Sequence, residues 1–313
     1  MSRHRPAPDR FTSPAVPKEL GLLFSFHYMG ERSLVGFLAS LGHRPRVFVD
    51  SGGFSAFTQG AAVDLLAYAR WLRANASGID HYASLDVIGD PRGTLVNQIR
   101  LEREGLRPLP IVHFGTDSSE VERYADRGYP YLCLGGMVPH LGSMSQALRF
   151  GKDHPGLVWL RACHEVAQRV GVGLHGFGVT SWSLVKGFPW RSVDSSSWSS
   201  AVRYGRLSVF DPTTGEWTTT PIRDVAKVMA LSPLLRSYGV EPTAIVRDAE
   251  ETRRFTVIAA VRSWVAASRW LTEQRHPVDV YTVTPGVETT TDHELRNAVR
   301  IAMGASHERG IVS

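Results

Sequence analysis

Apolar runs rich in β-branched and aromatic residues alternate with amphipathic stretches over the first two thirds of the chain. The runs lack a clean alternation of apolar and polar positions, as expected for strands buried on both faces. This arrangement predicts a parallel sheet covered by helices. The seven predicted strands are 22–27, 47–50, 81–86, 109–113, 131–134, 173–179 and 192–194.

The stretches between these runs repeat apolar residues at helical spacing and predict helices at 64–74, 91–103, 118–127 and 156–170. An eighth strand is expected at 244–247. Residues 203–220 carry the Pro, Thr-Thr and Gly punctuation of an inserted hairpin, and 222–237 and 250–275 have helical patterns. The pattern as a whole predicts an α/β TIM (β/α)8 barrel. We expect an extended arm at 1–18 and one catalytic domain at 19–313, with a mainly helical part at 221–313.

Composition narrows the class of protein. A chain of 313 residues with 43% hydrophobic content can bury one large core. No apolar run is long enough to span a bilayer and the start lacks a signal-peptide pattern, so we expect a cytoplasmic protein without membrane contact. Cys133 and Cys163 are the only cysteines, which excludes a disulfide framework and a structural zinc site built on several cysteines. The net charge of +5 suits a polyanionic partner, although it is also common in proteins that bind none.

Aspartates close three of the predicted strands. Asp50 ends an apolar strand and is followed by Ser51, Gly52 and a second glycine; Asp86 and Asp194 close two later strands. Catalytic groups of barrel enzymes lie at strand carboxyl ends. An Asp-Ser-Gly-Gly turn that caps the next helix is the structural alternative for Asp50 alone. Three carboxylates in a partly dry pocket can divide the roles of nucleophile and proton carrier, as the cleavage of a glycosidic bond with retention requires.

Other strand ends supply His113, the Gly135–Gly136 pair and His175. Twin glycines expose backbone groups that can contact the edge of a heterocycle, and a tight turn is the ordinary alternative. The two histidines are candidate acid–base groups or metal ligands, although structural histidines are more common.

The motifs together resemble, in their order, the tRNA-guanine transglycosylase (queuine tRNA-ribosyltransferase) family. They are Asp-Ser-Gly-Gly-Phe at 50–54, Leu-Asp at 85–86, Phe-Gly at 114–115, Leu-Gly-Gly-Met at 134–137, His-Gly-Phe-Gly-Val at 175–179 and Val-Asp-Ser at 193–195. The resemblance covers roughly residues 20–223. It implies a TIM barrel that exchanges a guanine in nucleic acid for a free 7-deazaguanine base through a covalent ribosyl–enzyme intermediate, with neither cofactor nor catalytic metal.

The resemblance also implies residue roles. Asp194 would attack C1′, Asp50 would carry the proton of the departing and incoming bases, and Asp86 would bind the polar edge of the base. Further residues implied in base binding are His113, in place of the family's glutamine, and Ser51, Gly52, Phe54, Gly135, Gly136, Met137 and His175, with Phe54 and Met137 as apolar walls. Arg203 and Arg206 would contact the nucleic acid.

The chain departs from the tRNA enzymes after the hairpin, because no cysteine follows Cys163 and their zinc subdomain therefore has no counterpart. In this it resembles divergent relatives of phages and bacterial gene clusters, DpdA-type proteins, that insert 7-deazaguanines such as 7-cyano-7-deazaguanine into DNA. DNA is thus the expected partner and a bacterial or phage-infected cytoplasm the expected location. The alternatives are a tRNA-modifying enzyme, a non-catalytic nucleic-acid-binding homologue and an unrelated barrel glycosidase; a homodimer is also possible.

Overall fold

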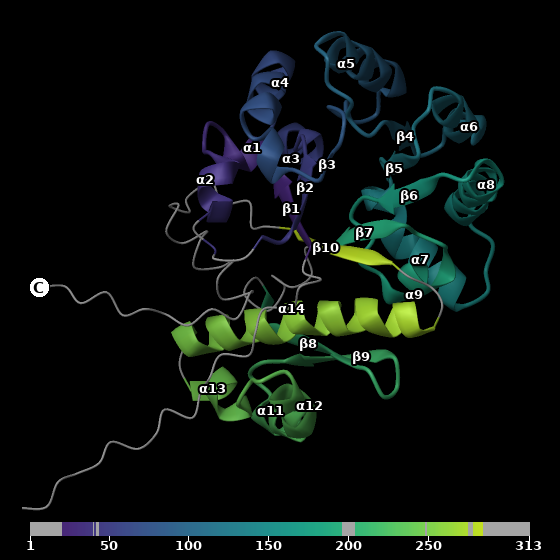
Figure 1. Ribbon diagram of the computed structural model, residues 1–313. Helices are drawn as coiled ribbons and strands as arrows, with labels where there is room; N and C mark the ends of the chain where they lie inside the picture. The colour runs from purple at the N-terminus through teal and green to yellow at the C-terminus, as the bar shows by residue number, and fades with distance from the viewer. Residues whose placement is uncertain are drawn as a thin grey trace, which may run out of the picture.

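A computed structural model describes residues 21–39, 41, 44–195, 204–247, 249–274 and 278–283. The fold is mixed α/β, with an eight-stranded parallel sheet that curls and has helices outside it (Figure 1). The strand order is β3-β2-β1-β10-β7-β6-β5-β4. The strands are β1 (Gly21–Ser25), β2 (Arg46–Asp50), β3 (His81–Tyr82), β4 (Ile111–His113), β5 (Tyr131–Gly135), β6 (Gly173–Gly176), β7 (Ser192–Ser195) and β10 (Asp279–Val283).

The seven strands predicted at 22–194 are confirmed, most of them shorter than expected. The predicted eighth strand is wrong: 244–247 lies in helix α13 (Pro242–Arg247), and β10 completes the sheet instead. A short apolar run does not by itself distinguish a strand from a buried helix, and Pro242 favours the start of a helix. β10 pairs with β1 on one side and with β7 on the other. The part at 221–313, expected to be mainly helical, therefore also supplies a strand.

The two outer strands of the sheet, β3 and β4, are joined by hydrogen bonds between the residues that follow β3 and those that precede β4. Ala83 and Leu109 form a parallel bridge. The Leu109 amide donates to the Tyr82 carbonyl at 2.8 Å, and the Ser84 amide donates to the Leu109 carbonyl at 3.0 Å. The sheet thus curls far enough for its edges to meet through one bridge, which is compatible with a TIM-like fold.

Helices connect consecutive strands and cover the outside of the sheet. They are α1 (Phe26–Met29), α2 (Leu34–Ala39), α3 (Gly53–Thr58), α4 (Leu65–Ala74), α5 (Pro91–Arg103), α6 (Ser119–Asp126), α7 (Leu141–Arg149), α8 (Pro155–Val170) and α9 (Trp182–Gly187), with 3₁₀ turns η1 (Ala76–Gly78) and η2 (Val138–His140). Local sequence determines several starts: Asp64 caps α4 by accepting from two backbone amides, and Asp90 followed by Pro91 begins α5. The outward faces of the strands pack on these helices, whereas residues such as Phe48 and Tyr131 form a separate interior cluster.

A hairpin and a long helix form the lower part of Figure 1. The hairpin consists of β8 (Arg206–Asp211) and β9 (Glu216–Pro221), and α14 (Ala249–Glu273) contacts both β8 and β10. The predicted helix at 222–237 is instead two, α11 (Val225–Ala230) and α12 (Ser232–Ser237), because a proline in the first turn of α12 cannot continue the preceding helix. Among the described helices, none is both long and apolar enough to cross a membrane.

Candidate active site

Three aspartates lie at the carboxyl ends of β2, β3 and β7. Asp50 is the last residue of β2, Asp86 follows β3, and Asp194 lies in β7. Burial raises the pKa of Asp50 to about 7, and the negative charges of Asp194 and Asp86 contribute to this increase. The carboxyls are therefore close enough to repel one another, although β1 and β10 separate β7 from β2 and β3 in the sheet.

The floor of this site is Cys133 on β5. Its side chain is fully buried in the interior cluster. Burial raises the pKa of this thiol far above its usual range, and Asp50, Asp194 and Asp86 each raise it further. Because one buried group is affected by all three carboxylates, the three aspartates act on the same part of the interior. The uncharged thiol provides an apolar base beneath them.

Glycines allow the loop after β2 to lie close to the neighbouring strands. Gly52 has a φ of +79°, and a Cβ at this position would lie 2.4 Å from the Ser25 hydroxyl oxygen. A Cβ on Gly53 would lie 2.4 Å from the Asp86 carbonyl. The Gly52 and Ser51 amides hydrogen-bond to the Asp50 carboxyl and partly offset the increase in its pKa. The Asp-Ser-Gly-Gly sequence thus brings the carboxyl close to Asp86 as well as starting α3.

Asp86 belongs to a polar group with His113 of β4 and Thr94 of α5. The His113 Nε2 lies 2.7 Å from Asp86 Oδ1, and the Thr94 hydroxyl donates to the same oxygen at 3.1 Å. Thr94 Oγ1 is also 2.9 Å from His113 Nε2 and accepts from the Val87 amide at 2.8 Å. All three side chains are largely buried. Sequence reasoning missed Thr94, for which the only signal is a small polar residue on the buried face of a helix.

Gly135 and Gly136 lie beside this group. A Cβ on Gly135 would be 3.4 Å from Asp86 Oδ2 and 2.7 Å from the Ile111 side chain, so glycine keeps the β5 backbone close to the carboxylate. Gly136 has a φ of +71°, which favours glycine. The Gly135 carbonyl accepts from the Phe114 amide at 2.9 Å and is thereby already engaged.

Asp194 is held by the loop after β6 and faces His175. The Gly178 amide donates to Asp194 Oδ1 at 2.8 Å. The His175 Nε2 lies 3.3 Å from the same oxygen, but its ring N–H does not point along a good hydrogen-bond direction. His175 is fully buried and stacks on Phe48, with ring centroids 4.5 Å apart. The structure therefore places His175 beside Asp194 in the interior.

The remaining predicted residues are not all accessible. Ser51 is fully buried and accepts from the Gly53 amide through its hydroxyl at 3.3 Å. Phe54 is 40% exposed at the start of α3, whereas Met137 has no exposed surface and packs in the core. Of the two expected apolar walls, only Phe54 can be reached from solvent. Arg206 is exposed on β8, and Arg203 lies outside the described residues.

Ser25 is a site residue that sequence reasoning did not identify. It ends β1 in register with Asp50, so both side chains point to the same side of the sheet. Ser25 is 6% exposed, and its hydroxyl has no hydrogen-bond partner among the described residues. A buried hydroxyl without a partner is unfavourable in the ligand-free protein, and a bound polar ligand would satisfy it.

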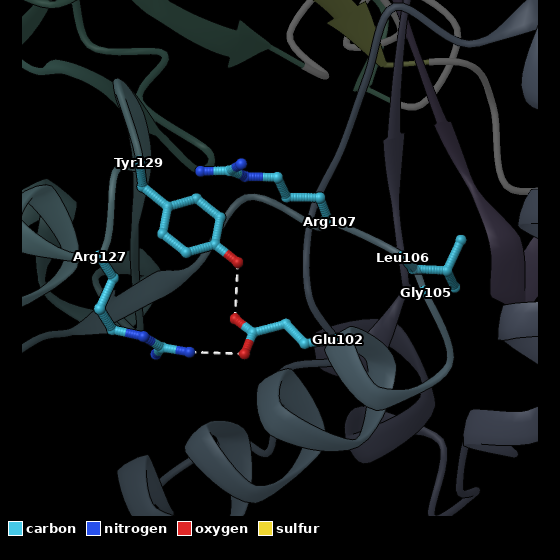
Figure 2. Close-up of a pocket in the computed structure, with 6 residues that line it drawn as sticks. All are labelled: Glu102, Gly105, Leu106, Arg107, Arg127 and Tyr129. Carbon is cyan, nitrogen blue, oxygen red and sulfur yellow. Dashed lines mark hydrogen bonds and ion pairs between the residues drawn. The ribbon is translucent and has the colours of Figure 1, made fainter.

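A separate hollow of about 390 Å³ lies at the opposite end of the sheet, where residues precede β4 and β5 (Figure 2). It is lined by Glu102, Gly105, Leu106, Arg107, Arg127 and Tyr129. Glu102 accepts from the Tyr129 hydroxyl at 2.6 Å and from Arg127 at 2.5 Å, and Arg107 donates to the Gly128 carbonyl at 2.7 Å. These charged groups are partnered within the chain, so the hollow lacks the opposed like charges of the aspartate site.

The aspartate site is thus an acidic centre in which the pKa of Asp50 is raised to about 7. It also contains two histidine–aspartate pairs, His113–Asp86 and His175–Asp194. Across the part of the chain that the structure describes, no group of three or more His, Cys, Asp or Glu has the geometry to hold a metal ion. Such a centre can move a proton at neutral pH and can offer a carboxylate for attack on an electrophilic carbon. In comparisons with known proteins, no family model and no curated protein matches the chain.

Proposed function

We propose that the chain is a TIM (β/α)8-barrel enzyme that exchanges guanine in DNA for a 7-deazaguanine by glycosyl transfer with retention. The observation that carries this proposal is the placement of Asp50, Asp86 and Asp194 at the carboxyl ends of β2, β3 and β7, where burial and the charges of Asp194 and Asp86 raise the pKa of Asp50 to about 7. A carboxyl of this kind can give and take a proton at neutral pH, while a second carboxylate acts as nucleophile.

In the first half of the proposed reaction, a carboxylate oxygen of Asp194 forms a bond to C1′ of the target nucleotide. The bond from C1′ to guanine N9 breaks, and its electron pair leaves with the base. Protonated Asp50 transfers its proton to the departing guanine and becomes a carboxylate. The products of this half are free guanine and a covalent Asp194–C1′ ester.

In the second half, the incoming 7-deazaguanine gives the proton of its N9 to Asp50. The N9 electron pair then forms the new bond to C1′, and the ester bond breaks with its electron pair returning to Asp194. Two displacements on the same carbon give overall retention. Asp50 ends protonated and Asp194 ends as a carboxylate, so the enzyme returns to its initial state.

The group of Asp86, His113 and Thr94 supports recognition of the base. A guanine and a 7-deazaguanine share the donors of the N1–H and 2-amino edge, which suit a carboxylate such as Asp86. Glycine at 135 leaves room beside this carboxylate. Phe54, which is partly exposed, offers an aromatic face for the flat ring. A target nucleotide in a duplex would have to be flipped out of the stack to reach this depth.

DNA is favoured over tRNA by the resemblance to the enzymes that lack the zinc subdomain. The sugar-directed alternative rests on Trp182, Trp190 and Trp198. It is weakened because the first two have structural roles, while Trp198 lies outside the described residues. Trp190 is buried and donates to the Leu184 carbonyl, and Trp182 donates to the Gly215 carbonyl at 2.9 Å.

The test uses purified protein, labelled 7-cyano-7-deazaguanine, and either duplex DNA, single-stranded DNA or tRNA. The expected result is label in DNA, together with a denaturation-resistant protein–DNA adduct when the incoming base is withheld. Label entering only tRNA would assign the same chemistry to the other polymer. If none of the three polymers takes up label or forms an adduct, the proposal is overturned. An Asp194→Ala protein that still transfers label would overturn the assignment of Asp194 as the nucleophile.

A further inference from the structure

A buried row of polar side chains leads across the interior of the sheet to Asp194. The Tyr131 hydroxyl on β5 is hydrogen-bonded to the Ser192 hydroxyl on β7, and Ser192 Oγ lies 2.6 Å from His175 Nδ1 on β6. The other ring nitrogen, Nε2, faces Asp194 Oδ1 at 3.3 Å. Tyr131, Ser192 and His175 are each at most 3% exposed. We refer to these three residues as the hydroxyl–imidazole chain.

The direction of the hydrogen bonds follows from the number of protons available. Burial raises the pKa of Tyr131 far above its usual range, so the phenol keeps its proton. Among the described residues, Ser192 is the only hydrogen-bond partner of that phenol. If Ser192 donated to Tyr131, the phenolic proton would be left buried without an acceptor, which is unfavourable by about 1–3 kcal/mol. Tyr131 therefore donates to Ser192.

The same reasoning fixes the tautomer of His175. A serine hydroxyl has one proton, and Ser192 is free to donate it to His175 Nδ1 once it accepts from Tyr131. Nδ1 is then an acceptor, and the ring proton is on Nε2, which faces the carboxylate of Asp194. A proton there attracts the carboxylate, whereas the other tautomer would direct a lone pair at it.

This arrangement makes the two oxygens of Asp194 different. Oδ1 accepts from the Gly178 amide and faces His175 Nε2, whereas no described residue hydrogen-bonds to Oδ2. The long, poorly aligned contact between His175 and Oδ1 is common for catalytic groups before substrate binds. With Oδ1 bound by the Gly178 amide and facing His175, Oδ2 is the oxygen of this carboxylate to which no described residue donates.

We infer that the hydroxyl–imidazole chain fixes His175 as the neutral Nε2-protonated tautomer, and that His175 is a positioning residue that orients Asp194 to attack C1′ through Oδ2. The attack itself rests on the proposed function; the tautomer does not. The stacking of His175 on Phe48, at an interplanar angle of 22°, restricts rotation of the ring.

The first experiment measures the ring-nitrogen chemical shifts of the full-length protein labelled with ¹⁵N-histidine. The signals of His175 are those lost in His175→Asn and shifted in Ser192→Ala. The expected result is a protonated Nε2 and a bare Nδ1. A proton on Nδ1, whether alone or in an imidazolium, would overturn the inference. This measurement needs no substrate, so it is valid even if no nucleic acid is modified.

The second experiment measures the rate of adduct formation and the KM for the incoming base. Ser192→Ala removes the donor to Nδ1. We expect the adduct to form about 10- to 100-fold more slowly with an unchanged KM, the size of effect found when a residue that orients a metal ligand is lost. Ser268→Ala is the matched control, because it makes the same substitution at a part-buried hydroxyl of α14 that donates to the Val278 carbonyl, outside the hydroxyl–imidazole chain. Equal losses in both variants, or none in Ser192→Ala, would overturn the positioning role. A wild-type protein that forms no adduct would instead contradict the proposed function.

Discussion

The carboxyl groups at the two ends of the curled sheet have pKa values shifted in opposite directions. At the amino end, Glu102 lies between Tyr129 and Arg127 (Figure 2). Burial alone would raise the pKa of Glu102, but hydrogen bonds from Tyr129 and Gln98 and the charge of Arg127 lower it overall. At the carboxyl end, Asp50 faces two other carboxylates and its pKa is raised to about 7.

The difference distinguishes a charge that the fold stabilises from one that it destabilises. Glu102 is more stable as an anion in the folded protein than in the unfolded chain, whereas ionised Asp50 is less stable. A fold has no structural reason to keep three like charges around one buried point. The unfavourable electrostatics at the carboxyl end are therefore evidence for chemistry, and the favourable pairing at the amino end is evidence for stability. Four substitutions test this division.

The largest expected effect is that of Asp194→Ala. Loss of the proposed nucleophile should lower transglycosylation by roughly 10⁴-fold or more and abolish the covalent adduct. The measurement is label transfer to DNA together with adduct detection on a denaturing gel. Asp153→Ala, at an exposed position, is the control and should have wild-type activity. A fully active Asp194→Ala protein would show that Asp194, at the carboxyl end of the sheet, takes no part in catalysis.

Asp50→Asn should have opposite effects on activity and stability. Turnover should fall by about 10²- to 10⁴-fold, because the amide cannot carry the proton. Since the folded-state pKa is above the unfolded one, the wild type loses stability as pH rises from about 4 to about 7. Above pH 7 the loss corresponds to up to about 4 kcal/mol, which the neutral amide avoids.

The stability of Asp50→Asn is measured by denaturant unfolding at pH 4 and at pH 8. The variant should be the more stable protein at pH 8 and should lose this advantage at pH 4. An advantage that is the same at both pH values would show that the effect is not the ionisation of Asp50.

Thr94→Val should weaken the Asp86–His113 group while preserving the shape of the side chain. It removes the hydroxyl that contacts both residues. We expect a loss of about 1–3 kcal/mol in unfolding free energy and a roughly 10-fold increase in KM for the incoming base, because a buried amide and carboxylate lose a partner. Thr58→Val, on the exposed face of α3, is the matched control. A change in adduct formation without a change in KM would contradict the assignment of this group to base binding.

Glu102→Gln should have the smallest effect and should affect stability alone. The lost charge should reduce the unfolding free energy by about 1 kcal/mol at neutral pH, since the Glu102 side chain is 24% exposed and its ion pair is partly screened. Because the folded-state pKa is lowered, this contribution is present above the usual carboxyl range and is lost as pH falls through it. The difference from wild type should therefore disappear in acid. Glu165→Gln, exposed on α8, is the control. Reduced base exchange by Glu102→Gln would contradict the assignment of Glu102 to stability alone.

Much of the carboxyl end could be predicted because its signals are local. An apolar run that ends in Asp50, with two glycines after it, indicates both the strand and its functional end. Asp194 likewise lies in its predicted strand, whereas Asp86, predicted to close a strand at 81–86, lies four residues beyond the end of β3. β10 could not be identified in this way, because it is a strand only through its pairing with β1 and β7, which are remote in the sequence.

The contacts of His175 could not be predicted from the sequence either. The resemblance implies a role in base binding, whereas the structure places the ring in the interior beside Asp194. The reason is register: His175 pairs with Ser192 on the neighbouring strand, so their side chains share one face of the sheet. No residue in either segment indicates that alignment. It arises from the packing of β6 against β7.

The position of β10 determines when the site can form as the chain is made. Tyr281 of β10 pairs with Asp194, and β10 also pairs with β1, so the strand that bears Asp194 gains one of its two neighbours only after nearly the whole described chain has been synthesised. Contacts this remote in sequence form slowly, because a long loop must close first. An incomplete chain therefore has an open sheet edge at β7, and the three aspartates come together as a late event in folding.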